Sequence, residues 1–292
     1  MRSHLINRLR ATAVAVGVTA TLAFSLSGGA PASAGDGAPY LALGDSVVFG
    51  YITHDAFAYV NPDNFIGYPQ VVGAARHLDV SNAACPGEAT GGFISSTGTD
   101  NGCRTFRAHF PLHVSYPGTQ EAYALAFLGA HPNTKLVSVS LGANDLFVLQ
   151  SSCAAALNPP LCIANGLSGA LGTIAANMNS ILGAIRATGF HGTLVVVNYY
   201  SLDYADAAGT GLTGLLNGAL TGTAAAHGAV VADVFSAFQG AATPAGGHTC
   251  VAGLLNGSPS NPTGCDVHPS ITGQNLIAQT VLRTFDAARA GD

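Results

Sequence analysis

Charged residues are scarce in this sequence, and cations are the scarcer kind. Only 9% of the 292 residues are Asp, Glu, Lys or Arg, with ten cations against fifteen acids. Proteins that bind nucleic acid need clustered Lys and Arg to neutralise phosphates, so this composition excludes nucleic acid as a partner. Beyond the N-terminal region we find no apolar run long enough to span a bilayer, and we expect no stable membrane insertion of the mature chain.

Several motifs of known chemistry are also absent. The patterns GxSxG, HExxH and SxxK do not occur, which excludes the usual α/β-hydrolase elbow, zincins and β-lactamase-like enzymes. No two cysteines have the short CxxC spacing of structural zinc sites, so we expect no metal. A GxGxxG run covers residues 209–214, but a polar stretch separates it from the preceding predicted strand. Dinucleotide binding needs the first glycine directly after a strand, and we therefore expect no cofactor.

The N-terminal residues have the three parts of an export signal. Three arginines precede an apolar stretch over residues 11–26, and small residues then end in Ala32-Ser33-Ala34. This order predicts a signal peptide over residues 1–34 and a secreted mature protein over residues 35–292.

Export also decides how the cysteines are interpreted. An exported chain favours disulfides over other uses of cysteine. Six cysteines allow 15 pairings, and the sequence alone does not choose among them. They are Cys85, Cys103, Cys153, Cys162, Cys250 and Cys265.

Short β-rich runs alternate with helical segments along the mature chain, which predicts a parallel sheet built from right-handed crossovers. We expect a single α/β domain, a three-layer α/β/α sandwich with a flavodoxin-like sheet of about five strands. The predicted strands cover residues 40–43, 78–82, 135–141, 193–198 and 230–234. The predicted helices cover residues 67–77, 120–130, 167–187, 212–227 and 271–288. Long loops are expected at 87–118 and 240–264.

Residues suited to acyl transfer are spread over four distant pieces of the chain. Ser46 follows a predicted strand in Gly44-Asp45-Ser46, and Asn144 follows another in Gly142-Ala143-Asn144-Asp145. Parallel strands end at one edge of a sheet, where open α/β folds bind ligands. A serine hydroxyl is a weak nucleophile unless an imidazole acts as base and fixed donors hold the oxyanion. His268 supplies an imidazole, and Gly87 supplies a backbone amide.

These pieces resemble the GDSL hydrolases, also called the SGNH family after Ser46, Gly87, Asn144 and His268 in successive blocks. The likeness is to secreted bacterial lipases, esterases and phospholipases with three disulfides. It implies Ser46 as nucleophile, His268 as base, and an oxyanion hole of the Ser46 and Gly87 amides with the Asn144 side chain. It also implies sequential disulfides, Cys85 with Cys103, Cys153 with Cys162, and Cys250 with Cys265.

One block departs from the family pattern. The family commonly has Asp-x-x-His, but Cys265 occupies the position three before His268, and Asp266 is only two before it. We therefore expect either Asp266 or a main-chain carbonyl to orient His268, because a carboxylate at this spacing can fall short of the ring.

The resemblance implies a secreted serine esterase that acts on lipid or short-to-medium acyl esters through an acyl-enzyme on Ser46. Two alternatives are a polysaccharide O-deacetylase that uses the same site and an inactive envelope-binding protein. We expect a monomer whose only partner is its ester substrate. The aromatic segment 51–65 is interpreted either as an acyl-pocket wall or as a packed loop.

Overall fold

The computed structural model describes residues 37–53, 57–258 and 261–291. The pattern of backbone contacts divides the chain into two units, Met1–Ala34 and Gly35–Asp292. The predicted signal peptide lies outside the described residues.

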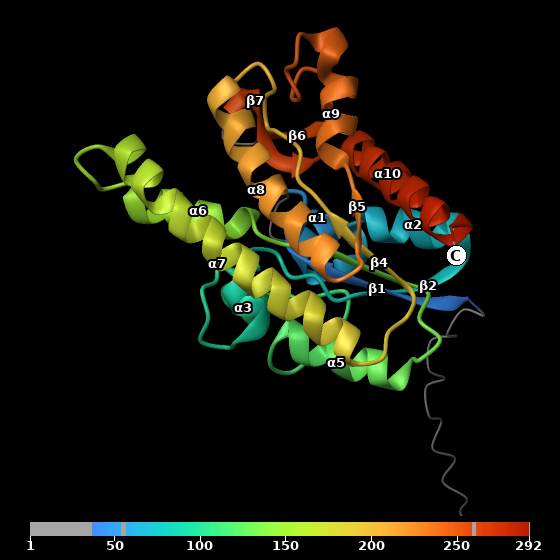
Figure 1. Ribbon diagram of the computed structural model, residues 1–292. Coiled ribbons are helices and arrows are strands. Elements are labelled where there is room, and N and C mark those ends of the chain that lie inside the picture. Colours follow the sequence, from blue (N-terminus) through green and yellow to red (C-terminus); the bar gives the residue numbers. More distant parts are fainter. Residues whose placement is uncertain (1–36, 54–56, 259–260, 292) are drawn as a thin grey trace, which may run out of the picture. The chain divides into compact units, whose positions relative to one another are not determined.

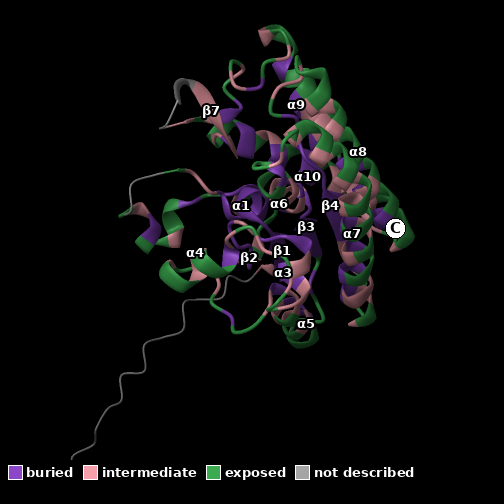
Figure 2. Ribbon diagram, turned by 90° about the vertical axis from the view of Figure 1, so that its left-hand side faces the viewer, coloured by how far each residue is buried: buried purple, intermediate pink, exposed green. Residues whose placement is uncertain are grey.

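Five parallel strands form the central sheet in the order β2-β1-β3-β4-β5 (Figure 1). All five predicted strands are confirmed. The apolar residues of the three central strands are almost all buried in the middle of the sandwich (Figure 2), whereas those of the two edge strands are partly buried. In parallel register, Gly44 at the end of β1 pairs with Ser140 at the end of β3. The strands are β1 (Ala38–Gly44), β2 (Leu78–Asn82), β3 (Leu136–Ser140), β4 (Thr193–Val197) and β5 (Val230–Ala232).

Helices cover both faces of this sheet, as the predicted α/β/α sandwich requires (Figure 1). One layer contains α3 (Thr90–Ile94), α5 (Gln120–Ala130), α7 (Pro159–Ala187) and α8 (Ala207–Ala226). The other contains α2 (Tyr68–Arg76), α9 (Val234–Ala242) and α10 (Ile271–Ala290). Further helices and 3-10 turns connect these elements: α1 (Ser46–Phe49), α4 (Cys103–His109), α6 (Ala143–Cys153), η1 (Ala58–Val60), η2 (Pro62–Asn64) and η3 (Thr243–Ala245).

The two segments expected as long loops contain regular structure. Residues 87–118 include α3 and α4, and residues 240–264 lead into an antiparallel hairpin of β6 (Leu255–Ser258) and β7 (Asn261–Pro269). Two helices also begin earlier than predicted: α7 begins at Pro159 and not at residue 167, and α8 begins at Ala207 and not at residue 212. The proline and the glycine-rich first turns hid these starts in the sequence. The GxGxxG run at 209–214 therefore lies inside α8 and forms no loop after a strand.

The structure contains three disulfides, paired in the order that the resemblance implies. They join Cys85 to Cys103, Cys153 to Cys162, and Cys250 to Cys265. The first encloses the segment after Gly87, and the third anchors β7, which carries His268. Each loop closure stabilises the fold by about 2 to 4 kcal/mol, chiefly by restricting the unfolded chain.

The expectation that no later stretch could span a bilayer is wrong for α7, which is long and apolar enough by length and composition. Its apolar residues nevertheless include a buried stripe, as the 3.6-residue periodicity predicts. This stripe packs on the core of the sandwich and consists of Ile174, Met178, Ile181, Leu182 and Ile185.

Candidate active site

Three neighbouring strand ends bring Ser46, Gly87 and Asn144 to one edge of the sheet. Ser46 opens α1 directly after β1, and Asn144 lies in the first turn of α6, just beyond β3. The chain beyond β2 continues beside β1, since the Cys85 N–H donates to Gly44 O at 3.0 Å, and Gly87 follows two residues later. Because β1 lies between β2 and β3, Ser46 is flanked by the other two positions.

A hydroxyl, an imidazole and a carboxylate form a row at this edge. Ser46 Oγ lies 2.9 Å from His268 Nε2, and His268 Nδ1 lies 2.9 Å from Asp266 Oδ1. The three side chains come from α1 and from β7, 222 residues apart between Ser46 and His268. This arrangement can remove the hydroxyl proton and stabilise the resulting imidazolium.

The Asp266 carboxylate reaches His268 despite the short spacing, so of the two groups expected to orient the ring, the side chain is the one that contacts it here. Both residues lie on β7, and alternate residues of a strand point to the same face. Burial alone would raise the pKa of Asp266, but hydrogen bonds from His268, Thr53 and the Val267 N–H, together with the charge of His268, lower it to about 2. Asp266 is therefore ionised beside the imidazole at neutral pH.

Two backbone amides at this edge have no partner in the described residues. The Ser46 N–H is the first of α1, where no intrahelical acceptor exists, and the Gly87 N–H donates to no described group. Gly87 has φ +84°, and a Cβ there would lie 2.6 Å from Asn101 O. Glycine is required here by the neighbouring backbone and by the positive φ.

The Asn144 amide is oriented by its neighbours. Asn101 Nδ2 donates to Asn144 Oδ1 at 2.8 Å, so Asn144 Nδ2 points the other way. It donates to Glu88 O at 3.0 Å and lies 3.4 Å from Asp45 Oδ2. The NH2 group is thus held between the loop that follows Gly87 and the residue before Ser46.

Asp45 is a buried carboxylate directly behind Ser46. It caps α1 by accepting from the Val47 N–H at 2.9 Å, and it accepts from the Tyr199 hydroxyl at 2.6 Å. Burial raises the pKa of Asp45 to about 6, although these two hydrogen bonds and the nearby His268 oppose the rise. The contact between Tyr199 and Asp45 comes from the fold, because the two residues are 154 positions apart in the sequence.

A cavity of about 310 Å³ opens beside Ser46 and His268. Its walls come from α6, from the loop after β4, and from the first half of α8. Apolar side chains supply much of the lining: Leu146, Phe147, Leu202, Leu212 and Leu216.

The described residues of the aromatic segment after α1 pack as a loop and do not line this cavity. Tyr59 contacts Tyr51, Phe65 and Phe110, with ring centroids 5.1 to 5.7 Å apart. The Tyr51 ring also lies 4.7 Å from the His268 ring. Of the two interpretations of this segment, the packed loop is confirmed for its described residues.

Residues 42–276 match the model of the GDSL-like Lipase/Acylhydrolase family. This chain belongs to that family. It is therefore an enzyme that hydrolyses carboxylic esters, and the family match covers every position of the site described above.

Solved structures share the fold of this GDSL-like hydrolase at low sequence identity. Phospholipase A1 from Streptomyces albidoflavus NA297 is 21% identical, with a TM-score of 0.56 over 86% of this chain and 99% of that one. The extracellular lipase from Streptomyces rimosus is 21% identical, with a TM-score of 0.54 and the same coverage. A mutant acetylxylan esterase from Geobacillus stearothermophilus is 15% identical, with a TM-score of 0.53 over 86% and 95% of the two chains. No curated protein matches this sequence.

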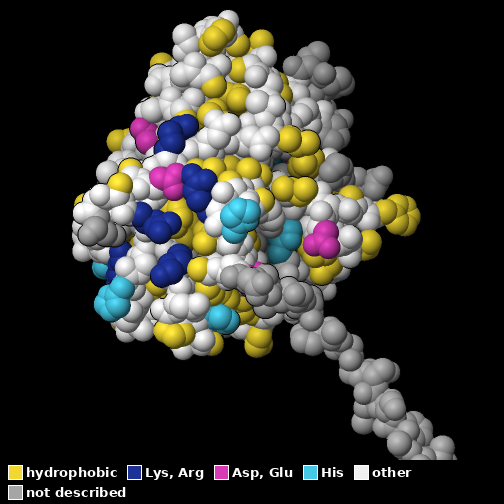
Figure 3. Space-filling model, turned by 90° about the vertical axis from the view of Figure 1, so that its right-hand side faces the viewer, with side chains coloured by type: hydrophobic (Ala, Val, Ile, Leu, Met, Phe, Trp, Pro, Cys, Tyr) yellow, Lys and Arg dark blue, Asp and Glu magenta, His cyan; other side chains and the backbone are white. Residues whose placement is uncertain are grey.

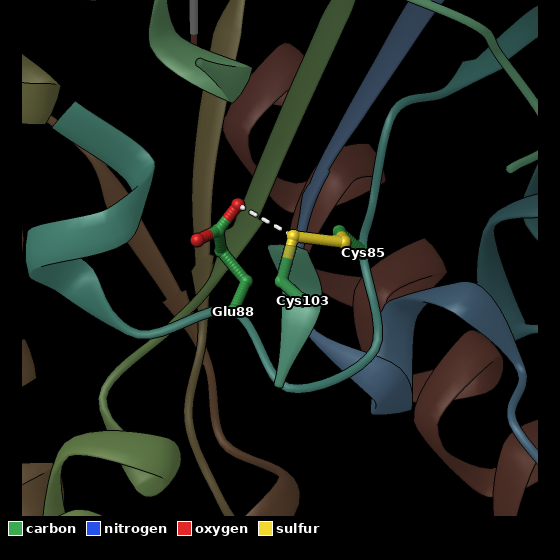
Figure 4. Close-up of side chains that lie close together, drawn as sticks. All are labelled: Cys85, Glu88 and Cys103. Atoms are coloured by element: carbon green, nitrogen blue, oxygen red, sulfur yellow. Dashed lines mark hydrogen bonds between the residues drawn. A yellow bond between two sulfur atoms is a disulfide. The ribbon is translucent and has the colours of Figure 1, made fainter. Parts of the chain in front are cut away.

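Behind Gly87, the GDSL-like hydrolase buries a glutamate next to a disulfide (Figure 4). Cys85, Glu88 and Cys103 are close enough to suggest a metal site, but both sulfurs are bonded to each other and hold no free thiolate. Glu88 Oε2 lies 3.4 Å from Cys103 Sγ. A disulfide sulfur carries no hydrogen, so this contact is a hydrogen bond only when the Glu88 carboxyl is protonated.

Glu88 is linked to the strand that presents Ser46. Gln120 Nε2 lies 3.4 Å from Glu88 Oε2 and also donates to Gly44 O at 3.0 Å. Burial raises the pKa of Glu88 to about 8, with a further rise from Asp100. The neutral carboxyl is therefore the form present at pH 7.

We predict that Glu88 makes stability fall as the pH rises. The folded pKa of about 8 exceeds the usual 4.5, so between these values the folded protein keeps a proton that the unfolded chain releases. The free energy of unfolding should decrease over this window by up to about 1.4 kcal/mol per pH unit. Urea unfolding at a series of pH values should show a flatter dependence for Glu88→Gln. The control Glu121→Gln changes a partly exposed glutamate, and equal slopes for both variants would contradict the prediction.

Proposed function

We propose that this chain is a secreted serine hydrolase that cleaves lipid esters or other esters of short-to-medium acyl chains. The observation that carries the proposal is the Ser46, His268 and Asp266 row at the mouth of a cavity with leucine and phenylalanine walls. Secretion is supported by the predicted signal over residues 1–34 and by three disulfides, which persist in oxidising compartments.

In the proposed reaction, Ser46 Oγ attacks the ester carbonyl carbon while His268 Nε2 takes the hydroxyl proton. Negative charge then develops on the carbonyl oxygen, where the Ser46 and Gly87 amides and Asn144 Nδ2 donate to it. The carbon–oxygen bond to the alcohol breaks, and His268 returns the proton to that oxygen. Water next attacks the acyl group on Ser46 with the same proton transfers, which releases the acid and restores the serine.

The cavity volume limits the acyl chain that it can hold. Its leucine and phenylalanine walls suit a short-to-medium acyl chain. Each buried CH2 contributes about 0.8 kcal/mol, which corresponds to up to about fourfold in kcat/KM.

A panel of esters tests this proposal. For p-nitrophenyl esters from acetate to palmitate, we expect kcat/KM to rise with chain length over the short-to-medium range and to level off before palmitate. The matched Ser46→Ala protein should release no product above background. If acetylated xylan releases acetate faster than every p-nitrophenyl ester in the panel is hydrolysed, polysaccharide deacetylation would be favoured instead. Failure of an organophosphate to label Ser46, with no hydrolysis of either class, would favour an inactive envelope-binding protein.

The oxyanion role predicts a large loss for Asn144→Ala. Removing one such donor typically costs about 10² to 10³ in turnover. We expect kcat on octanoate ester to fall by this factor with an unchanged melting temperature. Asn165→Ala, on the exposed face of α7, is the control. Near wild-type turnover in Asn144→Ala would remove this residue from the oxyanion hole.

The role of Asp266 predicts a steep loss for Asp266→Asn, because the amide cannot stabilise the imidazolium and favours the wrong tautomer. By analogy with the serine protease triad, kcat should fall by about 10⁴. Asp286→Asn, which breaks the surface ion pair with Arg76, provides the matched control in a steady-state assay. A loss below tenfold in Asp266→Asn would indicate that a main-chain carbonyl orients His268.

A further inference from the structure

Thr53 contacts the carboxylate that faces His268, although none of the family blocks includes it. Its hydroxyl donates to Asp266 Oδ2 at 2.6 Å. The other oxygen, Asp266 Oδ1, accepts from the Val267 N–H and lies 2.9 Å from His268 Nδ1. Among the described residues, β7 thus binds Asp266 Oδ1, and Thr53 donates to Asp266 Oδ2.

We propose that Thr53 is a positioning residue for the reaction proposed above, on which this inference rests. It fixes the Asp266 carboxylate so that Oδ1 stays on His268 Nδ1. A carboxylate two residues before its histidine on one strand can rotate about two side-chain bonds, and the Asp266 side chain is 14% exposed to solvent. A hydrogen bond from outside the strand removes that freedom.

The segment that carries Thr53 comes directly from the nucleophile's helix. Tyr51 packs against the His268 ring, and its N–H donates to Ser46 O at 2.9 Å. Residues 51–53 therefore contact all three members of the proposed row. The short segment fixes their relative positions, although it lies more than two hundred residues from β7 in the sequence.

Thr53→Val tests this role, because valine keeps the shape of threonine and loses the hydroxyl. Thr53 is exposed, so the fold should be unaffected. We expect kcat to fall about tenfold or more, as for the loss of one hydrogen bond to a charged group, with KM unchanged. Thr53→Ser retains a hydroxyl and should recover most of the activity.

A double-mutant cycle separates positioning from a structural role. In an Asp266→Ala background, Thr53→Val should cause no further loss of kcat. An equal loss in both backgrounds, or wild-type kcat in Thr53→Val, would overturn the proposal. Wild-type kcat in Asp266→Ala would contradict the proposed function of Asp266 itself and remove the role of Thr53 with it.

The hairpin formed by α6 and α7 is uncharged over most of its length. From residue 146 to residue 185 the sequence contains no Asp, Glu, Lys, Arg or His. The tip of the hairpin, residues 154–161, exposes Leu157 completely and Leu161 to 55%. Three alanines and two prolines complete most of this tip. The disulfide Cys153–Cys162 closes the tip at its base.

The hairpin begins at the site and leads away from it. Asn144 is in the first turn of α6, Phe147 and Gln150 line the cavity, and the helix ends at Cys153. Its 11 residues span about 16 Å at 1.5 Å per residue, so the tip stands beyond the cavity wall. Figure 1 shows this hairpin extending away from the sheet on the left. Lys and Arg gather on the opposite, right-hand face (Figure 3).

We propose that this tip docks on the zwitterionic surface of a phospholipid bilayer, which has no net charge, and turns the cavity toward it. A surface without charge suits such a lipid better than an anionic one, and apolar side chains enter the boundary of the acyl region readily. The cavity that would receive the acyl chain shares α6 with the tip, and exposed Leu202 lies at its other wall. The buried stripe of α7 packs on the core, so the hairpin docks and does not cross. This inference rests on the proposed action on lipid esters.

Vesicle flotation tests the docking with protein that carries Ser46→Ala, so that no lipid is consumed. Phosphatidylcholine vesicles should carry this protein upward, and Leu157→Ser with Leu161→Ser should lower the bound fraction relative to free protein about tenfold or more. Val251→Ser with Ile271→Ser removes two comparably exposed side chains from other elements and should leave binding unchanged. With Ser46 restored, the tip variant should hydrolyse p-nitrophenyl acetate at the wild-type rate.

No flotation of the Ser46→Ala protein, or equal flotation of the tip and control variants, would overturn the docking proposal. Dimerisation in size-exclusion chromatography that the tip changes abolish would assign the tip to a second copy instead. If the unaltered enzyme hydrolyses no ester, the proposed function is contradicted. The docking proposal is still tested, because flotation uses the Ser46→Ala protein.

Discussion

The parallel register of β2, β1 and β3 is the constraint on which the rest of the site depends. It ends three strands at one edge and places β1 between the other two. The residues that follow these strands therefore gather at this edge: Ser46, Gly87 and Asn144. A shift of one strand by one residue would reverse the faces of its side chains and remove its residue from the edge.

Buried polar groups behind this edge hold the three strand ends in place. Asp45 binds Tyr199 beyond β4 and lies near Asn144 beyond β3, while Gln120 bridges Gly44 and Glu88. Each of these groups would be costly to bury without its partner. Within the described residues, no buried side-chain nitrogen or oxygen lacks a hydrogen bond. The apolar sheet gives the site its position, and this polar layer gives its loops one conformation.

Much of the fold could be predicted from the sequence, because buried parallel strands are short apolar runs and their alternation with helices indicates a parallel sheet. Ser46 and His268 could be found because each stands in a distinctive block. The contact of Asp266 with His268 depended on β7, whose strand periodicity was hidden by a glycine-rich segment expected as a loop. Thr53 and Tyr199 carry no local signal, since their partners lie far away in the chain. Helix α6 was not predicted, although Asn144 in its first turn was identified as a site residue.

The most direct test of the account is a crystal structure of the protein inactivated by an alkyl phosphonate at Ser46. The phosphonyl oxygen imitates the oxyanion. We expect it to lie about 2.7 to 3.1 Å from the Ser46 and Gly87 nitrogens and from Asn144 Nδ2. The alkyl chain should lie in the cavity between α6 and α8. An oxygen that contacts none of these donors, or a phosphonate attached to another residue, would contradict it.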